Sequence, residues 1–399
     1  MKEPFLSAVS LLTKIEEAGY EAYFVGGSVR DLLLGREIAD VDIATSATPQ
    51  EIQAIFPKTI DVGAEHGTIV VLFSGKTYEV TTFRTEAEYE DCRRPSEVQF
   101  IRSLEEDLKR RDFTMNAIAM DKSGRFIDPF HGKKAIENRV IQTVGKAEER
   151  FSEDALRMMR AVRFYSQLHF TIESSTKDAL IQYAHLLKHI STERKLVEFE
   201  KLLVGKNRRN ALKVLHETGL YTYLPGMAPN SEGLIQMIKY DSTSLTIEEM
   251  WVLLIYQIRI YGTDIHSFLK IWKLPVKKIK KIVRIVNWLT IRLKMDWTVE
   301  SLYEAGEDTI FSTERVYNLL HNQKVDSRIN QLSEQYNALP IKQRSELEVT
   351  GNDIQEWFQK KQGPWIKEIL EMIEKAVIHQ KVSNHKRSIR EWLIKCNQK

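Results

Sequence analysis

The sequence has little cysteine. Only two of its 399 residues are cysteines, Cys92 and Cys396, which is too few for a disulfide framework or a cysteine zinc site. Two isolated thiols are typical of a protein in a reducing cytosol. The cysteine content therefore predicts a cytoplasmic protein that gains no stability from disulfides.

The sequence also has no long hydrophobic run. No window approaches 18 uncharged apolar residues, so we expect no membrane-spanning helix and no membrane partner. The charges of Glu3, Lys14 and Glu16 interrupt the first apolar stretch, which is unlike a signal peptide. With 43% hydrophobic and 28% charged residues, the composition excludes a disordered or fibrous chain. The length favours two to three domains.

A large excess of one charge is missing as well. The chain has 58 basic and 55 acidic residues, a net charge of +3. The distribution is uneven, because three segments hold many more basic than acidic residues. These are residues 201–215 with five and none, 271–300 with eight and two, and 381–399 with six and one. Recurring basic faces favour a phosphate-rich partner, although solvated helix faces explain the charges equally well.

The first 150 residues differ in texture from the rest. They hold 10 of the 18 glycines and several β-branched runs, with strand patterns at residues 20–25 and 41–44 and a hairpin pattern at 68–83. Apolar spacing predicts a helix over 3–18. The highly charged, aperiodic residues 84–110 are expected to form a mobile loop.

After residue 150 apolar residues recur almost throughout at three- and four-residue spacing. The sequence therefore predicts an α+β protein, with a small mixed β-sheet and helices in an N-terminal head and an elongated all-α neck, body and tail behind it. The expected borders are 1–147 for the head, 148–206 for the neck, 207–310 for the body and 311–399 for the tail.

The strongest local signal is a strand that runs into Gly26 and Gly27 and then into a helix carrying Arg30. Glycines let the backbone approach a ligand closely, and the helix N-terminus offers free N–H groups to an anion. A plain turn would have the same sequence, and the later glycines of a dinucleotide fingerprint are missing. Taken alone, the segment only suggests a phosphate-binding turn.

Two aspartates, Asp40 and Asp42, follow this turn. On a strand, residues i and i+2 point to the same face, so their carboxylates would lie side by side. Two like charges so close are unfavourable unless a cation shares them. Hard oxygen ligands suit Mg²⁺, which is normally held by one or two carboxylates and substrate phosphates. The combination predicts a magnesium-dependent phosphate chemistry at this strand.

This combination resembles the nucleotidyltransferase superfamily of DNA polymerase β type, and within it the class II transfer-RNA nucleotidyltransferases and their bacterial poly(A) polymerase relatives. Five motifs occur in family order and cover roughly residues 20–205; beyond them only the helical character matches. The motifs lie at residues 25–45, 110–117, 127–132, 153–157 and 193–203.

The resemblance implies the site. It assigns catalysis and Mg²⁺ binding to Asp40 and Asp42. It assigns nucleotide binding to one glycine, one aspartate and five arginines, namely Gly27, Arg30, Arg111, Asp154, Arg157, Arg160 and Arg163. Strand alternation makes Glu79 a candidate third carboxylate, with a solvent-facing glutamate as the equal alternative.

The fourth motif also has a physical interpretation. On a helix, Asp154 and Arg157 are neighbours at i and i+3. Aspartate only accepts hydrogen bonds and arginine only donates them, which matches the amino group and ring nitrogen of cytosine and adenine but not uracil or guanine. The alternative is an ordinary helix salt bridge. For Arg111 the alternative to triphosphate binding is an ion pair with Glu105 or Glu106.

The resemblance implies a template-independent enzyme that adds CCA to the 3′ end of tRNA from CTP and ATP, with the acceptor arm of tRNA as its partner and a monomer or homodimer as its state. Four basic residues of the body would contact phosphates: Lys277, Lys278, Lys281 and Arg284. The tryptophans near them, Trp272, Trp288 and Trp297, fit a helical core better than base stacking.

Three alternatives stay open. A poly(A) polymerase is disfavoured because residues 61–66 lack the basic run of that branch. An enzyme that adds only C-C is disfavoured by the long loop 84–100, which carries Glu86, Glu88, Asp91, Arg93 and Arg94; an enzyme that adds only A is harder to exclude. A non-catalytic RNA-binding protein is disfavoured by the intact carboxylates and arginines.

Overall fold

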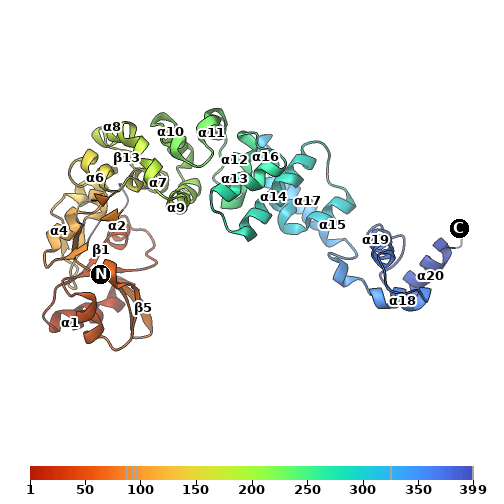
Figure 1. Cartoon of the computed structure of the whole chain (residues 1–399), viewed down its shortest axis with the longest axis horizontal. Coiled ribbons are helices and arrows are strands. Elements are labelled where there is room, and N and C mark those ends of the chain that lie inside the picture. The colour runs from red at the N-terminus through yellow and green to blue at the C-terminus, as the bar shows by residue number, and fades with distance from the viewer. Residues whose placement is uncertain (87–88, 91–93, 96–97, 324–325, 398–399) are drawn as a thin grey trace. The chain divides into compact units, whose positions relative to one another are not determined.

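The fold is described from a computed structural model of the chain (Figure 1), for residues 1–86, 89–90, 94–95, 98–323 and 326–397. The chain forms two compact units. The first comprises Met1–Ile238 with Ile271–Lys273, and the second comprises Lys239–Lys270 with Leu274–Lys399. No helix in the described part is long and apolar enough to cross a membrane.

A seven-stranded mixed sheet lies in the first unit, in the order β11-β10-β1-β2-β5-β4-β3. The pair β2 and β5 is parallel, and the other neighbours are antiparallel. The strands are β1 (Ala22–Val25), β2 (Asp42–Thr45), β3 (Thr59–Gly63), β4 (Thr68–Phe73), β5 (Lys76–Thr82), β10 (Ala119–Met120) and β11 (Phe126–Ile127). The predicted strands and hairpin are confirmed.

Two helices cover one face of the sheet. In α1 (Phe5–Glu17) the buried Phe5 packs edge-on against Phe24 of β1, with the ring centroids 5.0 Å apart. In α3 (Pro49–Ile55) Thr48 and Glu51 form a capping box. An apolar cluster covers the other face of the sheet over β1 and β2. It includes Val25, Ala44, Phe83, Leu104 and Leu108. Apolar groups therefore pack on both faces of β1, beside β2.

The prediction of a mobile loop over 84–110 is wrong for much of that segment. Strand β6 (Arg84–Glu86) pairs with β9 (Val98–Phe100), and residues 104–109 form helix α4 (Leu104–Lys109). Two further short strands are β7 (Tyr89–Glu90) and β8 (Arg94–Pro95). Leu104 and Leu108, four residues apart, bury one helical face, while the charged residues between them mask this period. Glu88, Asp91, Cys92 and Arg93 lie outside the described residues.

Helices dominate the rest of the first unit. They are α2 (Gly27–Leu33), α5 (Gly132–Glu137), α6 (Ala147–Glu153), α7 (Leu156–Leu168), α8 (Ser174–Tyr183), α9 (Thr192–Leu203), α10 (Arg208–Glu217) and α11 (Ser231–Ile238), with the short parallel strands β12 (Val140–Ile141) and β13 (Thr171–Ile172). Trp272 is fully buried and stacks on Phe199 of α9 at 4.8 Å. The preference for a core role is confirmed for this tryptophan.

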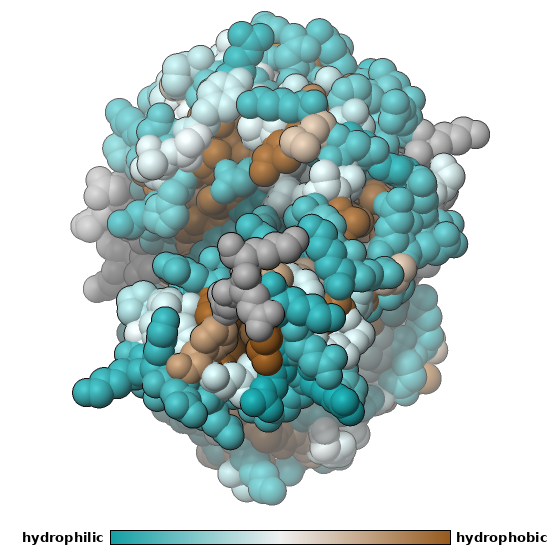
Figure 2. Space-filling model, turned by 90° about the vertical axis from the view of Figure 1, so that its right-hand side faces the viewer, coloured by the Kyte–Doolittle hydropathy of each residue, from teal (hydrophilic) through white to brown (hydrophobic). Residues whose placement is uncertain are grey.

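The second unit is helical. Its elements are α12 (Ile247–Gln257), α13 (Thr263–Ile271, whose last residue belongs to the first unit), α14 (Val276–Arg292), α15 (Val299–Ala305), α16 (Glu307–Leu320), α17 (Asp326–Asn337), α18 (Gly351–Phe358), α19 (Trp365–Ile378) and α20 (Lys386–Asn397). Trp288 and Trp297 pack against its core, 5.5 Å apart. On the face drawn in Figure 2, hydrophilic residues predominate and hydrophobic residues form small separate areas. The predicted fold class, a mixed-sheet head followed by helices, is confirmed.

Candidate active site

A cavity of about 500 Å³ lies in the first unit, between the start of β2 and helix α7. Its lining includes all seven residues that the resemblance assigns to nucleotide binding, together with Asp42. Asp40 does not line it. Residues that the sequence had not singled out also face the cavity, among them Arg110, Asp112, Asn116 and Arg194. The structure thus brings together residues up to 168 positions apart, from Gly26 to Arg194.

The turn before α2 requires a glycine at position 26, whereas the family resemblance had singled out Gly27. Gly26 caps α2 with φ +70°, and a Cβ atom there would lie 3.2 Å from Nη1 of Arg111 and 3.4 Å from Oδ2 of Asp42. At Gly27 the nearest atom to a Cβ would be Nη2 of Arg30, at an ordinary 3.6 Å. The backbone therefore approaches both functional side chains at Gly26.

This difference gives a matched pair of variants. We expect Gly26→Ala to lower kcat/KM for nucleotide incorporation by about tenfold or more, because φ +70° with ψ −136° is a strained backbone that costs an alanine about 1–3 kcal/mol, and its methyl group would displace Arg111. Gly27→Ala should change kcat/KM by less than about threefold, since its methyl group meets only ordinary contacts. Equal losses in steady-state kinetics of the two variants would contradict this assignment.

The acidic side of the cavity is built around Asp42. In the sheet Asp42 lies opposite Val25 of β1 and opposite Glu79 of β5. Asp40 directly precedes the strand, which begins at Asp42, and the buried Val41 separates the two exposed aspartates. The ladder ends at Asp42 because its partner strand turns away at Gly26. Burial of the carboxyl group and the charges of Glu79 and Asp40 raise the pKa of Asp42, while Arg111 and Arg30 oppose the shift.

A divalent cation fits this donor set. The raised pKa of Asp42 means that its negative charge is under-compensated, and a cation held with Asp40 would relieve it. Glu79 is solvent-exposed but faces Asp42 in register. The described residues contain no group of three His, Cys, Asp or Glu placed to hold a metal ion, so Glu79 does not complete a preformed set. Two carboxylates and a substrate phosphate are the combination that Mg²⁺ usually accepts.

The basic side of the cavity depends on buried carboxylates. Arg111 donates to Asp107 at 3.0 Å, as does Arg110 at 2.7 Å. Burial alone would raise the pKa of Asp107, but the two guanidinium charges hold it below its usual value. The alternative partners considered for Arg111, Glu105 and Glu106, are therefore wrong. The Nε atom of Arg111 is buried and has no hydrogen-bond partner among the described residues, which leaves a donor for a ligand.

Arg30 is held in a similar way. Its Nε and Nη2 atoms donate to both carboxylate oxygens of Asp31 at 3.0–3.1 Å, and its Nη1 atom donates to Asn116 at 2.7 Å. Asn116 in turn donates to Asp112 at 3.0 Å, and Arg160 donates to the same carboxylate at 2.7 Å. Asp112 and Asn116 follow Arg111 within the second motif, which was the sequence signal for them.

The carboxylate of Asp112, at the centre of this network, contributes to the pH dependence of the free energy of unfolding. Burial would raise its pKa, but Arg160 and the hydrogen bond from Asn116 lower the pKa of Asp112 to about 2. The usual unfolded value is about 3.9. Because the folded pKa is the lower one, the carboxylate stabilises the fold above pH 4, and this contribution is lost as the pH falls towards 2.

We therefore expect Asp112→Asn to reduce the free energy of unfolding by about 2 kcal/mol at pH 7, with a difference from the wild type that narrows below pH 4. Urea unfolding followed by circular dichroism between pH 7 and pH 3 measures this. A difference that stays constant over the whole range would show that Asp112 does not carry the charge contribution.

The geometry of the fourth motif differs from the prediction. Helix α6 ends at Glu153, and Asp154 is extended, with φ −133°, at the break before α7. Asp154 accepts from the backbone N–H of Leu156 at 3.0 Å and from Arg194 at 2.7 Å. The expected i, i+3 placement of Asp154 and Arg157 on one helix is thus wrong. A helix break orients the carboxylate into the cavity instead.

Arg157 and Arg163 of α7 are buried, Arg160 is partly exposed, and all three pair with carboxylates. Arg157 donates to Glu153 at 2.6 Å and to the carbonyl of Arg110 at 2.8 Å. Arg163 pairs with Glu198 of α9 at 3.0 Å, and burial lowers the pKa of Arg163 to about 10, so it stays charged at neutral pH. Its guanidinium lies 4.1 Å from the ring centroid of Phe164. These contacts place a fixed array of positive charge along one wall of the cavity.

Three family models match successive parts of the chain. The poly A polymerase head domain matches residues 22–142, the probable RNA- and SrmB-binding site of polymerase A matches 169–230, and the putative tRNA nucleotidyltransferase domain 2 matches 243–393. Together with the sheet and its arginine-lined cavity, these matches define a nucleotidyltransferase with a poly(A) polymerase type of head.

Full-length relatives narrow this class. The CCA-adding enzyme of Geobacillus sp. (strain WCH70) is 52% identical over 100% of this chain and 98% of its own, and that of Bacillus cereus (strain Q1) is 50% identical over 99% of both. The crystal structure of the Bacillus stearothermophilus CCA-adding enzyme in complex with CTP is 48% identical and superimposes with a TM-score of 0.92 over 100% of this chain and 98% of that one. This chain belongs to the family of bacterial CCA-adding enzymes and is a CCA tRNA nucleotidyltransferase. The prediction of CCA addition rather than poly(A) synthesis is confirmed.

Proposed function

We propose that Asp42, together with Asp40, carries the chemistry by which this enzyme adds CCA to the 3′ end of tRNA from CTP and ATP. In this reaction the 3′-hydroxyl oxygen of the RNA bonds to the α-phosphorus of the nucleotide, pyrophosphate leaves, and the hydroxyl proton is lost. The observation that supports the assignment is that Asp42 and Arg111 both lie against Gly26, where a Cβ atom would be 3.4 Å from Oδ2 of Asp42 and 3.2 Å from Nη1 of Arg111. The Asp42 carboxylate and the Arg111 guanidinium thus lie beside a backbone segment that no side chain covers, so a phosphate can approach all three.

Asp40 and Asp42 would hold Mg²⁺ with the triphosphate. When bound, the ion supplies a Lewis acid that lowers the pKa of the attacking hydroxyl and stabilises charge on the phosphate oxygens. Arg30 and Arg111 bind the triphosphate beside the Gly26-Gly27 turn, because the buried Asn116 and Asp107 hold their guanidinium groups in place there. Their fixed positions contribute stabilisation without reorganisation.

At the other end of the cavity, Asp154 and Arg157 recognise the base of the nucleotide. Asp154 accepts the amino hydrogen of cytosine or adenine, and Arg157 donates to the ring nitrogen. Arg160 and Arg163, held by Asp112 and Glu198, face the sugar and phosphates along α7. Uracil and guanine would leave these buried groups unpaired, which is a strong basis for rejection.

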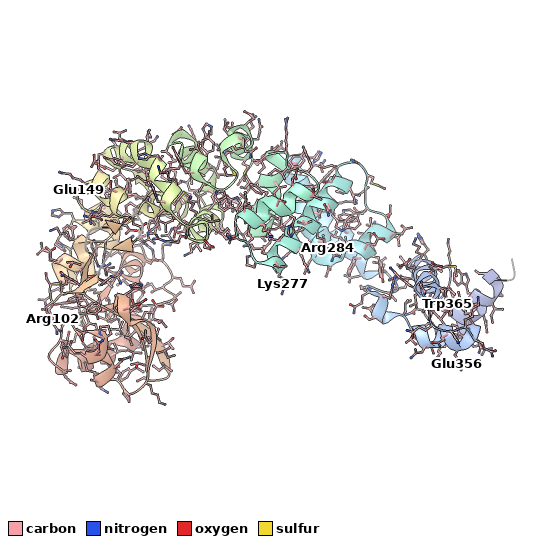
Figure 3. All side chains as sticks on the ribbon, viewed as in Figure 1. Arg102, Glu149, Lys277, Arg284, Glu356 and Trp365 are labelled. Atoms are coloured by element: carbon pink, nitrogen blue, oxygen red, sulfur yellow. The ribbon has the colours of Figure 1, made fainter. Side chains whose placement is uncertain are left out.

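The helical region would hold the acceptor arm of tRNA. Lys277, Lys281 and Arg284 are exposed on α14, and Figure 3 labels the first and the last of them. Arg284 also donates from Nη2 to the carbonyls of Glu304 and Ala305 at the end of α15, which leaves its other nitrogens for a phosphate. Complexes with tRNA are described for related enzymes, such as the Thermotoga maritima CCA-adding enzyme, which shares the fold with a TM-score of 0.64 and 22% identity over 99% of this chain and 96% of its own. The proposal includes four regions, namely a head at 1–147, a neck at 148–206, a body at 207–310 and a tail at 311–399. It also includes a cytoplasmic location and a monomer or homodimer as the oligomeric state.

The test is incorporation on a tRNA that ends before C-C-A, with labelled CTP and ATP singly and together. We expect two C and then one A with Mg²⁺, and a loss of more than about 10³-fold with excess EDTA that Mg²⁺ restores. Mn²⁺ is the second ion to test, since hard oxygen donors accept both. Incorporation that persists in EDTA would overturn the metal assignment to the aspartates.

A further inference from the structure

A second cavity, of about 670 Å³, adjoins the catalytic one in the first unit. Gln167 of α7 lines both cavities. Four basic side chains from separate segments converge on the second cavity, and no carboxylate is among the described residues that line it. They are Arg36, Arg139, His169 and Lys206. We refer to this group as the second basic pocket.

The arginines of the catalytic cavity differ from these residues in their partners. In the catalytic cavity Arg30, Arg111, Arg160 and Arg163 each pair with a buried carboxylate or one at the cavity edge. In the described part of the chain, none of the four members of the second basic pocket has an ion-pair partner. Like charges without counter-charges repel one another, so a bound anion would stabilise the arrangement.

The position of these residues suggests a purely structural explanation. Each follows the C-terminus of a helix, namely α2, α5, α7 or α9, where a cation complements the helix dipole. At the ends of α7 and α9, however, several carbonyls already accept hydrogen bonds from other protein groups. Asn207 donates to the carbonyls of Tyr165 and Ser166, and Ser166 donates from its hydroxyl group to Leu202. Only Arg36 among the four contacts such a carbonyl, at 3.5 Å to Gln167.

We propose that the second basic pocket binds backbone phosphates of the RNA substrate close to its 3′ end. The inference rests on the proposed function, because it takes tRNA as the substrate. The nucleotide triphosphate has its own arginines at the start of α2, so it needs no second set. The RNA strand, in contrast, must pass within reach of Asp42 to deliver its hydroxyl group, and the second basic pocket is the adjoining unpaired positive region.

The test uses the double variant Arg139→Gln/Lys206→Gln. The matched control is Lys58→Gln/Lys188→Gln, which removes the same charge from two exposed lysines of the first unit that line neither cavity. Fluorescence anisotropy with a labelled tRNA lacking CCA is measured against KCl concentration. We expect about tenfold weaker binding at 0.1 M salt, and a slope of log K against log salt that is shallower by about 0.7–0.9 for each phosphate that the variant no longer neutralises. The control should match the wild type.

Further measurements separate the possible sources of the phosphate. Binding of CTP and of pyrophosphate alone, measured by calorimetry, should be unchanged, and the charge-retaining variant Arg139→Lys/Lys206→Arg should recover most of the tRNA affinity. Weaker CTP or pyrophosphate binding with unchanged tRNA binding would overturn the RNA assignment. Unchanged tRNA affinity and salt slope with a lower Tm would show that the cations only stabilise helix ends. Wild-type CCA addition in the same preparation tests the proposed function separately.

Discussion

Asp42→Asn is expected to abolish CCA addition, with a loss of at least about 10³-fold in kcat on tRNA lacking CCA. The asparagine keeps the shape of the side chain but removes the charge that would share a divalent cation with Asp40. The variant should still bind tRNA, because no basic residue is changed. Single-turnover incorporation of labelled CTP measures the loss.

The same variant, Asp42→Asn, should not lose thermal stability although it loses activity. The pKa of Asp42 is raised, first by burial of its carboxyl group and then by the charges of Glu79 and Asp40, so the charged form is disfavoured. Removing the charge relieves that repulsion, so without Mg²⁺ the Tm of Asp42→Asn should equal or exceed that of the wild type. Asp178→Asn, at an exposed helix position, is the matched control and should change neither property. A variant that adds CCA at a near wild-type rate would remove Asp42 from the chemistry.

Asp154→Ala is expected to remove most of the preference for CTP and ATP over UTP. The carboxylate is the one acceptor proposed for the amino group of cytosine and adenine, and a hydrogen bond to a charged group contributes about 1.5–3 kcal/mol. We therefore expect kcat/KM for CTP and ATP to fall by about 10- to 100-fold, while kcat/KM for UTP stays the same or rises. Steady-state assays with each nucleotide on the matching tRNA measure the ratio.

Asp154 is a better test of selection than Arg157. Arg157 is buried and also donates to Glu153 and to a backbone carbonyl, so its removal would disturb the packing of α6 and α7 together with base reading. Glu148→Ala, at an exposed position of α6, is the control for a lost acid in the same region. Equal losses for CTP, ATP and UTP in Asp154→Ala would show that the carboxylate orients Arg194 rather than reads the base.

Much of the head could be predicted because its signals are local. The capping box at Thr48, the hairpin at residues 68–83 and the glycine turn before α2 each depend on residues a few positions apart. The errors also have local causes. The sequence pattern does not reveal helix α4 because exposed charges hide the spacing of Leu104 and Leu108, and the break at Asp154 has no glycine or proline to mark it.

The sequence alone determined the family, the fold class and the residue types that the chemistry needs, because motif order and periodicity are read along the chain. Only the tertiary structure decided which groups meet. Arg30 donates to Asn116 across 86 positions, Arg160 pairs with Asp112 across 48, and Arg194 pairs with Asp154 across 40. The sequence does not say which acceptor each arginine takes, because that depends on which carboxylate or amide oxygen the packing of distant segments places within about 3 Å.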